Sequence, residues 1–126
     1  LTEGAHIGHG AIIHGAHIGK NCLVGMNAVI MDDCEIGDEC IVGALAFVKA
    51  ETHIPARRMV VGNPAVIIKT VSDEMIAWKT KGTELYQKLP KELYETLKAV
   101  EPLREIPKDR PTQEAFYKTL EEFRKQ

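Results

Sequence analysis

Aliphatic residues recur every six positions through the first half of the chain. They stand at Ile12, Ile18, Val24, Ile30, Ile36, Val42, Val48, Ile54 and Val60. An amphipathic helix repeats every 3.6 residues and a strand every two, so a period of six fits neither as a single element. It fits a coil with three flat sides, in which each side contributes one inward aliphatic residue. The pattern therefore predicts a mainly β fold of stacked coils with an aliphatic core.

Small residues and glycines accompany this ladder. A small side chain stands two positions before most aliphatic residues, at Ala16, Cys22, Ala28, Cys34, Cys40, Ala46 and Thr52, and glycine often follows, at Gly19, Gly25, Gly37 and Gly43. We expect both to serve the corners, where the chain must turn. Cys22 and Cys40 would lie on the same corner of successive coils, close enough to approach. We interpret them as small buried residues rather than as a disulfide.

The composition changes near residue 71, which predicts a β-helix over residues 1–71 and a helical segment over 72–126. Ser72 can cap a helix whose apolar stripe is Met75, Trp78, Leu85 and Leu89, with Gly82 in the same row. We expect Pro90 to end this helix, and a second helix to carry Leu93, Leu97 and Val100. The proline-rich stretch 101–111 reads as a linker. A last helix would begin at Thr112 and present Phe116, Leu120 and Phe123.

Composition and charge argue against some classes of protein. The 126 residues are 44% hydrophobic, which is enough for a buried core, and their net charge of −2 argues against nucleic-acid binding. No apolar run reaches the roughly 20 residues that a membrane span needs. The three cysteines are odd in number and lack CxxC spacing, which indicates a reducing compartment and hence a cytoplasmic protein.

The stretch "IGKNCLVGMNAVIMDDCEIGDECIVG" resembles the tandem pattern of the hexapeptide-repeat family. That resemblance implies a left-handed parallel β-helix. "VVGNPAVII" at 60–68 is similar to the segment that closes such helices before a C-terminal α-helix. The resemblance covers roughly residues 4 to 89.

Three of the five histidines lie in "HIGHGAIIHG" at 6–15. Residues five apart on one strand face opposite sides, so His9 and His14 would not bind one ion within a single chain. Yet "GHGAIIHG" resembles the γ-class carbonic anhydrases, and this implies a homotrimer with zinc between subunits. His9 and His14 would then be ligands from neighbouring subunits, and a third histidine would lie upstream of Leu1. Iron or cobalt could replace zinc.

The absence of that third histidine implies an N-terminal truncation or a lost metal, and a repeat entered in mid-pattern favours truncation. By the same resemblance, His6 is a surface residue or lies beside the ligands. His17 and His53 are expected to be solvated surface residues.

"VGMNAVIMD" and "AWKTKGTELYQ" are most similar to the phenylacetate-pathway and carnitine-operon branch of the γ-carbonic-anhydrase-like proteins, which includes a CoA thioesterase. This likeness implies a metalloenzyme in which zinc-bound hydroxide attacks an acyl-CoA thioester or carbon dioxide. Tyr86 matches a tyrosine that reaches the metal site in related anhydrases. Packing within its helix is an equally good interpretation of Tyr86.

Two other functions stay open. Many hexapeptide proteins are CoA-dependent acyltransferases that share "GNPA" and use a single histidine as general base. A non-catalytic trimeric scaffold would keep the fold alone. The expected partners are other copies of the chain and a small-molecule or acyl-CoA substrate, with no nucleic acid and no membrane.

Overall fold

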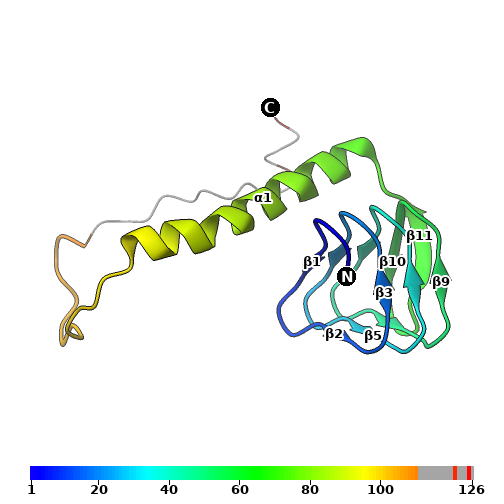
Figure 1. Ribbon diagram of the computed structural model, residues 1–126, viewed down its shortest axis with the longest axis horizontal. Coiled ribbons are helices and arrows are strands. Elements are labelled where there is room, and N and C mark those ends of the chain that lie inside the picture. The colour runs from blue at the N-terminus through cyan, green and yellow to red at the C-terminus, as the bar shows by residue number, and fades with distance from the viewer. Residues whose placement is uncertain (111–120, 122–124, 126) are drawn as a thin grey trace. The chain divides into compact units, whose positions relative to one another are not determined.

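The computed structural model describes residues 1–110 together with Glu121 and Lys125. Short strands stack into three parallel sheets around a common core (Figure 1). The first sheet contains β1 (His6–Ile7), β4 (Leu23–Val24), β7 (Ile41–Val42) and β10 (Arg58–Val61). The second contains β2 (Ile12–Ile13), β5 (Val29–Ile30) and β8 (Phe47–Val48). The third contains β3 (His17–Ile18), β6 (Glu35–Ile36) and β9 (His53–Ile54). The predicted left-handed parallel β-helix is confirmed.

The segment after the last coil closes the stack. β11 (Val66–Thr70) turns back and pairs with β10 in the antiparallel sense. A cis peptide joins Asn63 to Pro64 in the connection between the two strands. The expectation that residues 60–68 end the β-helix before a helix is therefore confirmed.

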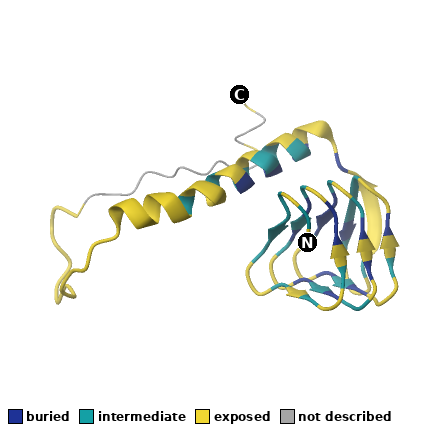
Figure 2. Cartoon of the chain, in the orientation of Figure 1, coloured by how far each residue is buried: buried dark blue, intermediate teal, exposed yellow. Residues whose placement is uncertain are grey.

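The aliphatic ladder forms the core, as the period predicts. The inward residues are almost fully buried at Ile18, Val24, Ile30, Ile36, Val42, Val48, Ile54 and Val60. Cys22, Cys34 and Cys40 are buried beside them at the corners. Figure 2 shows buried positions alternating with exposed ones around the coils. Burying one such aliphatic side chain contributes about 1.5–3 kcal/mol, so the stacked ladder is the main stabilising element of the coils.

Ile12 is an exception, and its predicted place in the core is wrong. Ile13 pairs with Ile30 and faces inward, whereas Ile12 pairs with Val29 and is 54% exposed. Each corner contains one residue with positive φ, and these residues are six apart from Gly15 to Arg57 but only five apart between Gly10 and Gly15. This first coil is therefore one residue short, and a shift of one residue moves a side chain to the other face.

The glycines that follow the aliphatic residues do not make the turns, contrary to our expectation. The left-handed corner positions instead hold side chains such as Asn27, Glu39 and Leu45, at φ values of 55, 57 and 60°. Gly25 is needed for another reason, because a Cβ there would lie 2.4 Å from the backbone nitrogen of Ala44 in the next coil. These glycines allow the coils to stack closely.

Helix α1 (Asp73–Thr96) follows the strands. Ser72 caps it as predicted, since Ser72 Oγ accepts a hydrogen bond from the backbone nitrogen of Met75 over 3.3 Å. The helix continues through Pro90, so the predicted break there and the separate second helix are wrong. A proline within a helix removes one backbone hydrogen bond, and here the helix extends for two further turns without that bond.

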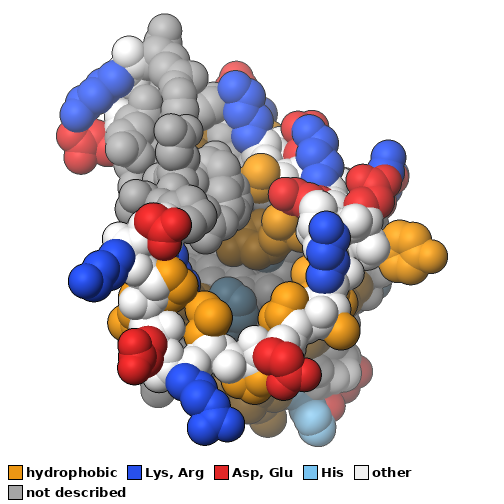
Figure 3. Space-filling model, turned by 90° about the vertical axis from the view of Figure 1, so that its left-hand side faces the viewer, with side chains coloured by type: hydrophobic (Ala, Val, Ile, Leu, Met, Phe, Trp, Pro, Cys, Tyr) orange, Lys and Arg blue, Asp and Glu red, His pale blue; other side chains and the backbone are white. Residues whose placement is uncertain are grey.

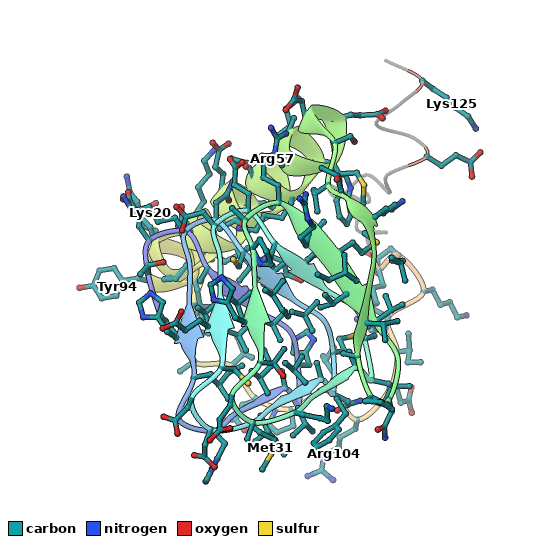
Figure 4. All side chains as sticks on the ribbon, turned by 90° about the vertical axis from the view of Figure 1, so that its right-hand side faces the viewer. Lys20, Met31, Arg57, Tyr94, Arg104 and Lys125 are labelled. Atoms are coloured by element: carbon teal, nitrogen blue, oxygen red, sulfur yellow. The ribbon has the colours of Figure 1, made fainter. Side chains whose placement is uncertain are left out.

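The first part of α1 lies along the corner that joins the third sheet to the first. Asn21 Nδ2 donates to Thr80 Oγ1 over 3.0 Å, and the Arg57 guanidinium bonds the carboxylate of Asp73. Figure 4 shows Arg57 at this side of the coils and Met31 at the opposite side. The helix therefore contacts successive coils in reverse order along the stack.

Contacts divide the chain into two compact units, Leu1–Thr83 and Glu84–Gln126. The change in composition at residue 71 marks the place where strands give way to helix. Residues 101–110 contain no helix or strand, as expected for a linker, and Leu103 and Ile106 are exposed there. In Figure 3 hydrophobic side chains reach the surface among charged ones. The predicted helix from Thr112 lies outside the described residues.

Within the part of the chain that the structure describes, no helix is long and apolar enough to cross a membrane.

Candidate metal site

The two histidines predicted as ligands stand at opposite ends of strand β2. His9 lies in the turn before β2, and His14 follows directly after it. The two residues therefore occupy neighbouring corners of the same coil. Among the residues that the structure describes, no group of three His, Cys, Asp or Glu side chains is placed to hold a metal ion. The described part of one chain therefore does not bring three such ligands together.

His14 has a carboxylate partner. Its Nδ1 lies 2.9 Å from Oδ1 of Asp32, which belongs to the corner of the next coil. The two side chains form an ion pair when His14 is protonated, and a neutral His14 has a ring nitrogen that can bind a divalent metal such as zinc.

His9 is held by its backbone and presents an exposed side chain. Its carbonyl oxygen accepts a hydrogen bond from the backbone nitrogen of Asn27 over 2.9 Å. The next residue, Gly10, has a φ of 70° and makes the turn. An exposed imidazole on a fixed corner can act as a ligand when another molecule supplies the remaining donors.

The outer surface of the second sheet, between these two corners, is apolar. Ile12, Val29 and Phe47 form a cross-strand row on this surface, and all three are at least partly exposed. Met26 and Leu45, which are 55% and 71% exposed, continue the apolar surface at the corner that carries His9. We call these five residues the apolar face. Figure 1 shows β2 and β5 on the side of the coils away from the first turns of α1.

The other three histidines lie on the first and third sheets. His53 Nδ1 lies 3.1 Å from Glu35 Oε2 on the outer surface of the third sheet, where His17 pairs with Glu35 in the backbone register. Both histidines are exposed, as expected. His6 is half-buried, and its Nδ1 lies 3.4 Å from Thr83 Oγ1.

Burial is the main cause that lowers the pKa of His6, and the positive charge of Lys79 and the neighbouring His9 lower it further. His6 is therefore neutral near pH 7 and packs under α1.

The sequence analysis missed two polar residues that α1 buries. Lys79 and Thr83 are 4% and 8% exposed, and they follow Met75 at intervals of four along one helix face. Lys79 Nζ donates to Asn21 Oδ1 over 2.7 Å and to the carbonyl of Gly4. Burial lowers the pKa of Lys79 to about 8. The spacing of four residues from Met75 places Lys79 and Thr83 on the buried face of the helix. A search for apolar residues alone does not find polar residues on that face.

Tyr86 lies on α1 in the unit formed by residues 84–126, and its side chain is 48% exposed. Its role beside a metal stays a prediction.

The three cysteines are free thiols in the core. Cys22 and Cys40 donate to the carbonyl oxygens of Gly37 and Pro55, each over 3.1 Å. The neighbouring side chain of Cys40 is the main cause that raises the pKa of Cys22, and burial raises it further. The prediction that they are small buried corner residues is confirmed.

Comparison with known proteins identifies the repeat. The family described as "Bacterial transferase hexapeptide (six repeats)" matches residues 15–50. The chain belongs to the hexapeptide-repeat family. Carnitine operon protein CaiE from Escherichia coli O139:H28 is 47% identical over 111 residues, which are 88% of this chain and 57% of that protein. CaiE from Shigella dysenteriae serotype 1 is equally similar, so the chain spans about 57% of the length of these curated relatives. The predicted likeness to carnitine-operon proteins is confirmed.

Two solved structures share the β-helix. A Bacillus cereus protein named as a proposed acetyltransferase superposes with a TM-score of 0.56 at 29% identity, covering 68% of this chain and 54% of the other. A serine O-acetyltransferase from Brucella melitensis gives a TM-score of 0.51 at 26% identity, covering 54% of this chain and 29% of the other. Both of these structures are named as acetyltransferases, so acyl transfer stays open as an alternative function.

Proposed function

We propose that this protein is a metal-dependent hydrolase or lyase of the γ-carbonic-anhydrase-like type, acting on an acyl-CoA thioester or on carbon dioxide. One observation carries the proposal. Two histidines flank an exposed apolar face, and His14 is already paired through Nδ1 with Asp32. This arrangement suits a site that is shared between subunits.

The apolar face supplies the reason for assembly. Covering exposed apolar residues such as Met26 and Leu45 with another subunit would stabilise the assembly. The proposed partner is a second copy of this chain, in a closed homotrimer with three equivalent interfaces. Such an interface brings the His14 end of one β2 toward the His9 end of a neighbour. A third ligand in addition to His9 and His14 would complete the set.

The residues of this chain would have different roles at the site. His9 and His14 would hold the ion through neutral imidazole nitrogens, and the apolar face would exclude water around it. When bound, zinc lowers the pKa of water toward about 7 and so supplies a nucleophile at neutral pH. Tyr86 would orient the substrate. The free cysteines agree with the reducing cytoplasm that we expect for such a protein.

The test is metal analysis of the purified protein. His9→Ala and His14→Ala should each remove most of the bound zinc, because each change deletes an inner-shell bond. His17→Ala is the matched control, since His17 is an exposed histidine on the third sheet. Equal zinc content in all three variants would show that the ligand pair is wrongly assigned.

A CoA-dependent acyltransferase is the second candidate. The similarity to acetyltransferase structures favours it, and the His14–Asp32 pair could also act as an oriented general base. The discriminating assay is turnover of acetyl-CoA with an amine or sugar acceptor by metal-free protein. Transfer that survives chelation and disappears in His14→Ala would establish this function. A folded trimer without metal or turnover would instead indicate a scaffold.

A further inference from the structure

We propose that protonation of His6 detaches residues 73–83 of α1 from the first coil, so that this part of the helix responds to acid. We call the contacts that residues 4–6 make with α1 the latch. All of these residues belong to the compact unit Leu1–Thr83. The inference does not rest on the proposed function, and it involves no metal.

The latch joins two turns of α1 to one short segment of the first coil. Thr83 Oγ1 lies 3.4 Å from His6 Nδ1, although the two residues are 77 positions apart. One turn earlier in the helix, Lys79 Nζ donates to the carbonyl of Gly4. His6 belongs to β1, which stands at the edge of the first sheet (Figure 1). The contacts between α1 and the first coil are therefore made at a sheet edge, through two polar side chains of the helix.

The buried face of α1 is mostly polar. Met75, Lys79 and Thr83 are the buried residues of the helix, and only Met75 is apolar. The printed acceptors of Lys79 Nζ are neutral oxygens of Asn21 and Gly4. The coils, by contrast, are held together by their aliphatic core. A segment with few buried apolar side chains opens at a lower cost than a core does, so α1 can detach while the coils stay folded.

Ionisable groups act on the half-buried His6 from two elements. Lys79 approaches from α1, and His9 stands in the turn after β1, three residues further along the chain. The neighbouring strand β4 places the apolar Leu23 opposite His6. A proton on His6 therefore adds a second positive charge near the ammonium of Lys79, at a position that is partly shielded from water. Repulsion and desolvation both oppose a docked helix over a charged His6.

The direction of the response follows from the same environment. Burial is the main cause that lowers the pKa of His6, and Lys79 and His9 lower it further. Detachment of the helix exposes His6 to water, where its pKa returns toward the ordinary 6.5. The detached form then binds protons more readily than the docked form, so docking is favoured above pH 6.5 and weakens as the pH falls below it. Free carboxyl groups titrate near pH 4, and a response between about pH 7 and 5 thus belongs to histidine.

The first measurement is hydrogen exchange of the helix backbone, followed by mass spectrometry at about pH 7 and about pH 5.5 with correction for the intrinsic rates. In wild type, peptides from residues 73–83 should lose protection at the lower pH, whereas peptides from the inner coils should keep it. His6→Gln cannot take up a proton, so its helix should be equally protected at both pH values. The proposal is overturned if wild type shows no change, or if His6→Gln loses as much protection as wild type does.

Two other histidines provide matched controls. His17→Gln changes an exposed histidine of the third sheet, and His9→Ala removes the imidazole in the turn after β1. Both variants should still lose protection of residues 73–83 in acid. Loss of the response in either control would contradict its assignment to His6.

The second measurement is the pH at which His6 itself titrates, read from its ring resonances by NMR. Wild type should titrate below 6.5. Lys79→Met removes the nearby positive charge, and we expect the midpoint to rise. Thr83→Val keeps that charge but removes the hydroxyl group from the latch, so it should also raise the midpoint by weakening the docked form. A midpoint at or above 6.5 in wild type, or one that neither substitution moves, would refute the latch.

Discussion

Lys79 Nζ donates a hydrogen bond to Asn21 Oδ1 over 2.7 Å, joining residues that are 58 positions apart. The same ammonium bonds the carbonyl of Gly4, so one buried side chain of α1 connects two successive coils. Neither acceptor is a carboxylate, and the charge is therefore stabilised only by neutral oxygens. Burying an ammonium in this way is costly, which is why the pKa of Lys79 falls to about 8.

This contact predicts how stability depends on pH. The folded pKa of Lys79, about 8, lies below the ordinary lysine pKa of 10.5, so the unfolded chain binds more protons between these pH values. Stability should therefore rise from pH 8 toward 10, with a contribution of up to about 1.4 kcal/mol per pH unit from this group. Urea unfolding of wild type and Lys79→Met at several pH values measures it. The variant should lack this rise, and Lys88→Met, at an exposed position, should keep it.

Assembly should depend on the apolar face. Leu45→Glu places a charge on this face, at the corner that carries His9, and we expect the trimer to dissociate into folded monomers. The backbone tolerates glutamate at this corner position, because Glu39 and Glu51 occupy equivalent corners at φ values of 57 and 61°. Light scattering gives the mass, and circular dichroism confirms the fold. An unchanged trimer would place the interface elsewhere, and Glu35→Lys on the third sheet should have no effect.

Close stacking of the coils predicts a large cost at Gly25. A methyl group there would lie 2.4 Å from the backbone nitrogen of Ala44, and neither backbone can easily move. Gly25→Ala should lower the free energy of unfolding by about 3 kcal/mol. Gly4→Ala offers a comparison, since its Cβ would meet nothing nearer than 3.5 Å and only the positive φ opposes it. A smaller loss in Gly25→Ala than in Gly4→Ala would contradict the packing argument.

The proposed substrate can be tested on one metal-loaded sample. We expect release of free thiol from a panel of CoA esters, together with weak or absent hydration of carbon dioxide in stopped-flow measurements. The resemblance to a branch that includes a CoA thioesterase is the reason for expecting the esters. Fast hydration without thiol release would instead indicate carbonic anhydrase activity. Tyr86→Phe should reduce turnover without reducing zinc content if Tyr86 orients the substrate.

The sequence by itself determined the coiled β fold, because a six-residue period reports directly which side chains face a three-sided core. The pair of His9 and His14 came from a resemblance and stays a prediction. The sequence could not place Ile12, since a coil that is one residue short changes the register without breaking the period on either side. Nor could it predict that α1 continues through Pro90, because local preference there is overridden by the rest of the helix.

Only the tertiary structure decided which side chains meet. The contact between His14 and Asp32 joins two coils, and its cause is the different length of their corners. The burial of Lys79 likewise depends on the position of α1 against Gly4 and Asn21. Contacts between residues that are distant in the chain follow from how the coils stack, and a repeat pattern describes each coil without measuring the distance between their side chains.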